Sequence, residues 1–340
     1  MASEPLSDML KLLGARSVLT GTLIAGGAWS IRFPPPEQIK YWGIVEGNCW
    51  VRMDDDGTVI QLRAGDVLLI LRSAPITLAT DLSITGVSIN EVLSHSTDEI
   101  CKVGNGEDFT LIGGTVMLEP RGRGLLFDAL PPLIRVDGSA PQAEPLRWIL
   151  SQLMRERIDQ LPGADAASKQ LVHLMFIHIL RAHLHQQDSV APGWLRLASD
   201  QRFASVLALI HGQPGKDWKL SELAKAAGMS RATFALHFKA TAGTGPLGYL
   251  TEWRMRLAER ALCHGDVSIA TLAESLGYSN ESAFSHAFKR VTGRAPKWVR
   301  NKGGGGTASN DCDEIYLSSA GTPNFADTGY LPTSTVSTNF

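Results

Sequence analysis

The sequence has few cysteines, no long apolar run and almost no net charge. Only four of its 340 residues are cysteines, at positions 49, 101, 263 and 312, and no two of them form a Cys-x-x-Cys pair. They cannot supply a disulfide framework or a cysteine-based zinc site. Apolar stretches such as residues 67–71 are far shorter than the ~20 residues that span a bilayer, and residues 1–13 lack the basic start of a secretory signal. We therefore expect a soluble, cytoplasmic protein that does not enter a membrane.

The positive charge is concentrated in one part of the chain. The whole sequence carries 32 Lys and Arg against 34 Asp and Glu, a net charge of −2. Residues 1–199 have a net charge of −5, residues 200–302 have +7, and residues 303–340 have −4. A basic segment of this length is typical of a surface that faces phosphates, although a solvated basic face is the more common cause.

The residue composition and hydrophobic periodicity of the sequence change twice along the chain. Residues 21–93 contain short runs of β-forming residues separated by Gly, Pro and Asp, which predicts an antiparallel sandwich or barrel. Residues 146–161 and 166–185 then show a 3.6-residue period, which predicts a helical pair. Residues 200–302 are helical throughout, whereas residues 303–340 begin with four glycines and predict a disordered tail.

These patterns predict an α+β protein with an N-terminal β-barrel followed by helices, and then an all-α domain. The expected boundaries are residues 1–190 for the first domain, 191–199 for a linker, 200–302 for the helical domain and 303–340 for the tail.

The basic segment contains an internal duplication. Residues 220–230 match residues 269–279, and the downstream pair Phe234 and Phe238 matches Phe284 and Phe288. Each copy has a short apolar-faced helix, a glycine at a turn, and a second helix whose phenylalanines at i and i+4 form a buried stripe, as in a helix-turn-helix unit. One such match could be any helical hairpin. Two matched copies inside the only basic segment favour a DNA-binding pair.

The segment between the copies predicts a rigid connector. Residues 246–263 form one expected helix that begins at a proline, and at ~1.5 Å per residue it measures ~27 Å. Recognition helices in successive major grooves lie ~34 Å apart, so this length is suitable. Arg254, Arg256 and Arg260 on the connector could contact phosphates or be solvated surface charges.

At this point the sequence resembles a known family. Residues 277–290 read GYSNESAFSHAFKR and are followed by Gly293 and Pro296, while residues 253–258 read WRMRLA. Residues 200–302 resemble the DNA-binding domain of the AraC family of bacterial transcription regulators. Residues 1–190 resemble more loosely the cupin-type sensor of one AraC subgroup, through residues 46–50, 62–69 and 129–134. The resemblance implies sequence-specific DNA binding that activates or represses transcription under the control of a signal sensed by the N-terminal domain.

The family pattern also implies which residues meet DNA. In the second unit, base edges would be met by Asn280, Glu281, Ser282, Ser285 and His286, with Lys289 reaching a phosphate. In the first unit the corresponding positions are Arg231, Ala232, Thr233, Ala235 and Leu236. Ala235 and Leu236 offer only apolar contact, for instance to a thymine methyl group.

The expected partners are double-stranded DNA, a small-molecule effector of unknown identity, RNA polymerase and a second copy of the chain; no cofactor is expected. The homodimer rests on residues 171–180, which are apolar almost all round and predict a helix with one face left over after packing on the barrel. The aromatic residues Trp29, Phe33, Trp42 and Trp50 could line a ligand pocket or form ordinary core.

Two enzymatic alternatives compete with a regulator. A metal-dependent cupin enzyme fused to a DNA-binding domain would need histidine ligands, but no histidine precedes His95, and Tyr41 and Ile76 occupy places where related domains often have histidine. DNA repair by cysteine alkyl transfer would need an activated thiolate, and Cys49 and Cys101 have no basic neighbours in sequence. We therefore predict no metal site and no enzymatic activity, while oxidant sensing by these cysteines stays open.

Overall fold

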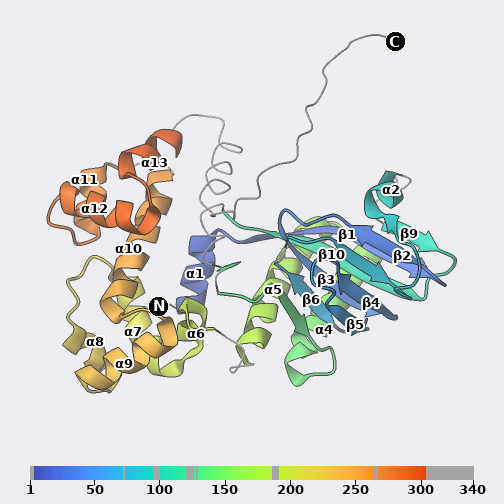
Figure 1. Cartoon of the computed structure of the whole chain (residues 1–340), viewed down its shortest axis with the longest axis horizontal. Helices are drawn as coiled ribbons and strands as arrows, with labels where there is room; N and C mark the ends of the chain where they lie inside the picture. The colour runs from blue at the N-terminus through green and yellow to red at the C-terminus, as the bar shows by residue number, and fades with distance from the viewer. Residues whose placement is uncertain are drawn as a thin grey trace, which may run out of the picture.

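The computed structural model of the chain describes residues 4–71, 73–94, 100–119, 126–127, 129–185, 191–263 and 267–303. For residues 302 and 303 it describes the backbone only. It places a sheet-rich N-terminal domain beside a helical domain, with the helix α1 (Pro5–Leu13) between them (Figure 1). The predicted tail lies outside the described residues from position 304 onward. None of the described helices is long and apolar enough to cross a membrane.

The N-terminal domain consists of two sheets that enclose an apolar core. A six-stranded sheet has the order β11-β6-β3-β10-β1-β9, and a five-stranded sheet has the order β5-β4-β7-β2-β8. The core between them includes Ile31, Ile44, Val51 and Leu78, all fully buried. The strands are β1 (Arg16–Gly26), β2 (Ser30–Phe33), β3 (Ile39–Glu46), β4 (Asn48–Met53), β5 (Val59–Arg63), β6 (Val67–Ile70), β7 (Ile76–Ala79), β8 (Val87–Ser88), β9 (Ile100–Gly104), β10 (Phe109–Met117) and β11 (Leu133–Val136). The predicted α+β class is confirmed. The N-terminal domain is built as two facing sheets, and the predicted antiparallel pairing holds except for β1 with β9 and β2 with β8, which pair in parallel.

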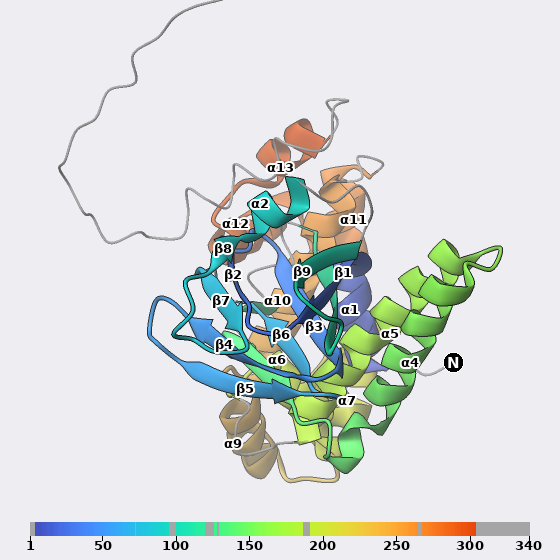
Figure 2. The same ribbon diagram turned by 90° about the vertical axis from the view of Figure 1, so that its right-hand side faces the viewer.

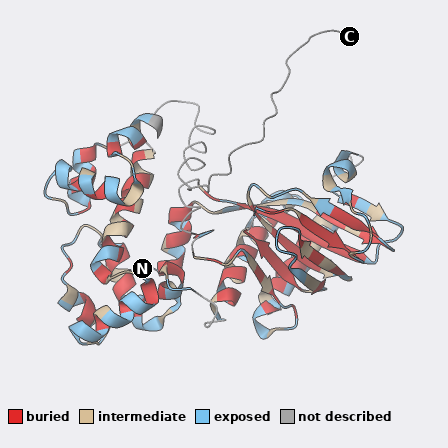
Figure 3. Cartoon of the chain, viewed as in Figure 1, coloured by how far each residue is buried: buried red, intermediate tan, exposed pale blue. Residues whose placement is uncertain are grey.

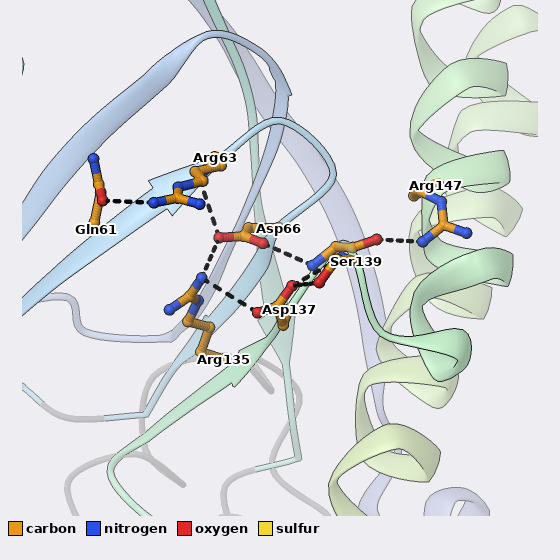
Figure 4. Close-up of polar contacts among 8 residues, drawn as sticks. Gln61, Arg63, Asp66, Arg135, Asp137, Ser139 and Arg147 are labelled. Carbon is orange, nitrogen blue, oxygen red and sulfur yellow. Dashed lines mark hydrogen bonds and ion pairs between the residues drawn. The ribbon is translucent and has the colours of Figure 1, made fainter.

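A buried carboxylate joins this sheet to the helices that follow it. Asp66, only 2% exposed, accepts hydrogen bonds from the backbone N–H of Arg63 (3.0 Å) and from the guanidinium of Arg135 on β11 (2.8 Å). Its other oxygen accepts from the backbone N–H of Gly138 at 2.7 Å, and the Gly138 carbonyl accepts in turn from Arg147 on the next helix (Figure 4). Because a buried carboxylate is tolerated only when its oxygens are satisfied, these contacts hold the β5–β6 turn, β11 and the helix in one arrangement.

The predicted helical pair is confirmed as α4 (Glu144–Asp159) and α5 (Ala164–His185), which lie side by side (Figure 2). They follow the 3₁₀ helix η1 (Pro141–Ala143); α2 (Ile89–Ser94) lies at the other end of the sheets. The fully buried residues Val172, Met175 and Phe176 turn one face of α5 toward the core, where α5 packs on β1 and β11.

Helix α1 is one of the elements that the sequence patterns did not predict. The Glu4 carboxylate accepts from the backbone N–H groups of Leu6 (3.1 Å) and Ser7 (2.8 Å), Pro5 takes the first helical position, and Gly14 ends the helix. Its buried leucines and Met9 pack against α6, α7 and α10 of the helical domain. Helix α1 therefore belongs in sequence to the N-terminal domain but also contributes to the core of the helical domain.

The helical domain contains two equivalent units at the two ends of a long connector (Figure 1). The elements are α6 (Trp194–Ser199), η3 (Gln201–Phe203), α7 (Ala204–Gly212), α8 (Leu220–Ala226), α9 (Arg231–Ala242), α10 (Pro246–Cys263), α11 (Ile269–Ser275), α12 (Glu281–Thr292) and α13 (Pro296–Gly303). The predicted connector is confirmed at both ends as α10. Residues 194–199 of the predicted linker form α6, whose residues Trp194, Leu195 and Leu197 are buried.

Candidate nucleic-acid interface

The helices α9 and α12 occupy the same place in the two units. Each has 12 residues and follows a seven-residue helix, α8 or α11, after a turn in which Gly228 (φ +64°) or Gly277 (φ +78°) takes the left-handed conformation predicted for it. Fully buried phenylalanines anchor both helices: Phe234 and Phe238 in α9, and Phe284 and Phe288 in α12. The duplication in sequence is therefore a duplication of structure.

The outer sides of these helices are exposed (Figure 3). The predicted DNA-contacting residues lie within these helices or, for Asn280, at the N-cap of α12. Ala235 and Ser285 are half-buried; the exposed members are Arg231, Ala232, Thr233, Leu236, Asn280, Glu281, Ser282, His286 and Lys289. Two faces of like geometry, one on each unit, are thus available to a ligand that spans both.

In the second unit, Asn280 has a structural task that the sequence pattern did not show. Its side-chain oxygen accepts a hydrogen bond from the backbone N–H of Ala283 at 2.8 Å, so Asn280 is the N-cap of α12. The cap leaves its amide nitrogen, which lies 3.3 Å from the Ser279 hydroxyl, as the group able to donate elsewhere. His286 stands one turn further along, exposed on the same helix.

The first unit presents a more apolar face. Ser230 caps α9 by accepting from the backbone N–H of Thr233 at 3.2 Å, and the two hydroxyls lie 2.8 Å apart. Leu236 is 69% exposed. Such a side chain can contact a thymine methyl group, whereas it cannot read a base by hydrogen bonding.

The connector arginines do not share one role. Arg254 donates from Nε to the carbonyl of Pro214 at 2.6 Å and from Nη2 to the carbonyl of Lys216 at 2.9 Å. Arg256 forms ion pairs with Glu252 (3.8 Å) and Glu259 (3.4 Å) on its own helix. The guanidinium of Arg254 is therefore committed to the protein backbone, in place of the phosphate contact that its sequence position suggested.

A buried polar group links α1 to the first unit. His211 at the end of α7, with its side chain 1% exposed, lies between the Asp8 carboxylate (3.3 Å) and the Tyr249 hydroxyl (2.9 Å). Its ring also stacks on Trp253 with centroids 3.8 Å apart. Burial lowers the pKa of His211 to about 4, against the opposing attraction of Asp8. The imidazole is therefore neutral at pH 7, with Nδ1–H donating to Asp8 and Nε2 accepting from Tyr249.

The N-terminal domain holds a cavity of about 520 Å³ beside β1 and β3. Its walls are mostly apolar, and they include the basic residue Lys40 and the acidic residue Glu37. The Lys40 ammonium donates to the Thr115 hydroxyl at 2.7 Å, and burial lowers its pKa. Of the four aromatic residues singled out in the sequence, Phe33 and Trp42 line this cavity, while Trp29 packs against Phe109 in the core with the two rings tilted by 43°.

Tyr41 and Ile76, which occupy positions where related cupin domains often have histidine ligands, are not placed to bind a metal. Tyr41 is 1% exposed and its hydroxyl donates to the carbonyl of Val18, and Ile76 is buried in the apolar core. No group of three or more His, Cys, Asp or Glu able to hold a metal occurs among the residues that the structure describes. Burial, together with Asp66, raises the pKa of the Cys49 thiol to about 12, which disfavours the thiolate that alkyl transfer requires.

Known proteins resemble the chain over most of its length. A family model described as Cupin matches residues 4–185, and one described as Helix-turn-helix domain matches residues 223–302. A protein of Streptomyces antibioticus described as an AraC-like transcription regulator is 39% identical over 293 residues, which cover 86% of this chain and 97% of that protein. A protein of Streptomyces lividans with the same description is 38% identical and covers 86% of this chain and 96% of its own. The crystal structure of the DNA-binding domain of AdpA with a target DNA covers 30% of this chain and 92% of its own at 29% identity, with a TM-score of 0.28.

Proposed function

Because the chain belongs to the AraC-like transcription regulators, with an N-terminal cupin domain and a helix-turn-helix DNA-binding domain, we propose that α9 and α12 read two successive motifs on one face of duplex DNA. The observation that carries the proposal is the pair of outward faces on duplicated units at the two ends of α10. The basic charge of residues 200–302 supports it, since phosphate contacts supply much of the affinity for DNA. The regulator has no enzymatic activity in this proposal.

Substitutions on α12 should separate base reading from phosphate contact. His286→Ala should change the preferred base at one position, with ~1–3 kcal/mol of discrimination lost there. Lys289→Ala should weaken binding to all duplexes alike and reduce the salt dependence by about one phosphate contact. Binding constants for a selected duplex and its single-base variants, taken at several salt concentrations, provide the measurement.

Asn280 needs a variant that keeps the helix cap. Asn280→Ser retains a side-chain oxygen for the Ala283 N–H and removes the amide, whereas Asn280→Ala would also cost about 1 kcal/mol of helix stability. A uniform loss of affinity from the His286, Asn280 and Lys289 variants would show that the base-reading face lies elsewhere.

The cavity of the cupin domain is where we propose that a small-molecule effector binds. Its apolar walls suit an apolar molecule, and half-buried Lys40 can pair with an anionic group on that molecule in competition with Glu37, which lines the same cavity and opposes the lowering of the pKa of Lys40. The aromatic anion anilinonaphthalene sulfonate is a suitable probe. Lys40→Met should weaken its binding about tenfold through the loss of a charge-assisted hydrogen bond.

Lys102→Met is the matched control for that measurement, because Lys102 is exposed and paired with Glu107 at 2.6 Å. Equal binding of the probe by both variants and the unaltered chain, followed by fluorescence titration, would remove Lys40 from the effector site.

We also propose that the regulator is a homodimer joined through α4 and α5. The predicted leftover face on α5 is reduced to Leu174, which is 36% exposed, but α4 adds two exposed apolar side chains, Trp148 (54%) and Ile158 (73%). Two copies of such a surface can pair symmetrically. Contact with RNA polymerase, the remaining partner implied by the resemblance, belongs to the same proposal, and in vitro transcription from a bound promoter tests it.

A further inference from the structure

The two helix-turn-helix units have separate apolar cores. The core of the second unit is built around Met255, Phe284 and Phe288, while the first unit shares the large cluster that includes α1 and α5. Of the described residues, Leu257 is the one packed against both clusters. Apolar packing between the two units therefore adds little to what the single helix α10 does to fix the orientation of one unit relative to the other.

A polar junction on one side of α10 supplies a further restraint. The two carbonyls that accept from Arg254, those of Pro214 and Lys216, lie in the loop between α7 and α8 of the first unit. The same guanidinium lies 5.7 Å from the ring centroid of Tyr278, which follows the turn of the second unit. A planar guanidinium with several donors in fixed geometry suits this task better than a flexible ammonium.

The backbones of the two units also touch at this point. A Cβ atom on Gly215 would stand 2.3 Å from the carbonyl oxygen of Ser275, and one on Gly277 would stand 2.2 Å from the carbonyl oxygen of Gly215. The loop of the first unit can approach the turn of the second this closely only because both positions are glycine. Arg254 reaches the same two segments and lies beside the contact, 3.1 Å from the Cβ position of Gly277.

We propose that Arg254, together with the Gly215–Gly277 contact, is a positioning device that sets the orientation of α12 relative to α9, and so determines which spacing of two DNA motifs the protein accepts. The proposal rests on the proposed reading of DNA by both helices. When two binding surfaces are held rigidly, the second binds at a high effective concentration on DNA of the matching spacing and poorly on any other. Loosening the junction should therefore lower the affinity for DNA of the matching spacing and reduce the difference in affinity between that spacing and others.

Two variants test this without altering either recognition helix. Arg254→Met keeps the aliphatic part of the side chain and removes the guanidinium. Gly215→Ala adds one methyl group at a position whose backbone conformation is open to alanine, so its main effect is to force the loop away from Ser275. The intact chain is measured with duplexes carrying both motifs at the selected spacing, duplexes with one to three base pairs inserted or removed between the motifs, and a duplex carrying one motif.

Both variants should bind the selected duplex about tenfold more weakly than the unaltered chain, and their affinities for the different spacings should converge. Affinity for the single-motif duplex should not change, and that readout separates positioning from a general loss of folding. Arg254→Lys, which can donate to one carbonyl, should bind the selected duplex with an affinity between those of Arg254→Met and the unaltered chain. Arg256→Met is the matched control: its ion pairs lie within α10, and the ranking of the spacings should stay as it is in the unaltered chain.

An unchanged ranking of spacings in both Arg254→Met and Gly215→Ala would overturn the proposal. So would an equal loss of affinity on single-motif and two-motif duplexes, since that would make Arg254 a phosphate contact. If the unaltered chain binds the single-motif duplex as tightly as the complete site, the reading of DNA by two helices is wrong and the positioning role fails with it.

Discussion

Lowering the pH from 7 toward 4 should destabilise the protein through His211. The folded-state pKa of this buried imidazole, about 4, lies below its ordinary value of 6.5. Between these two values the unfolded chain binds a proton that the folded chain excludes, so stability is complete above pH 6.5 and falls as the pH falls. At ~1.4 kcal/mol per pH unit, the loss at pH 4 is on the order of 3 kcal/mol.

Two variants identify the group responsible. His211→Leu should remove this part of the pH dependence, seen as a shallower slope of unfolding free energy against pH in urea titrations. Asp8→Asn should have the opposite effect, because Asp8 raises the pKa of His211 and its loss disfavours the charged imidazole further. The same slope in His211→Leu as in the unaltered chain would assign the acid sensitivity to the carboxylates.

Trp148→Arg should convert the proposed dimer to a monomer. A charge at this exposed position of α4 would have to be buried in the proposed interface without a partner, while in the monomer it stays in water. Affinity for a DNA carrying two copies of the site should fall by about 10²–10⁴, since the second copy would no longer bind as part of the same molecule. Sedimentation at micromolar concentration gives the mass, and competition binding gives the affinity.

The control is a charge introduced at another exposed apolar residue. Val59 on β5 is 45% exposed, and Val59→Arg should leave the dimer intact. An unaltered chain that sediments with the mass of one copy would contradict the dimer, and it would leave the assignment of α9 and α12 to DNA untouched.

The recognition helices could be located from the sequence because their determinants are local. A glycine that takes positive φ and a pair of phenylalanines at i and i+4 act within about 15 residues of each other. The duplication doubled that signal, and the bounds of α10 followed from its proline and the glycine beyond its end. Helix α1 had the same kinds of signal in Glu4, Pro5 and Gly14, but its nine residues form a single short apolar pattern with no second copy to support it.

The sequence by itself determined the two helix-turn-helix units, the connector, the sheet-rich character of the first domain and the family. It could not determine where polar side chains find partners far along the chain, since such contacts depend on how the elements pack. Asp8 meets His211 and Arg254 meets the carbonyls of Pro214 and Lys216 only after folding brings distant segments together. The tertiary structure alone therefore decided that α1 completes the first unit. It also decided that Arg254, for which the sequence left open a phosphate contact or a solvated position, joins the two units, because buried donors and acceptors must be satisfied by whichever groups the fold places beside them.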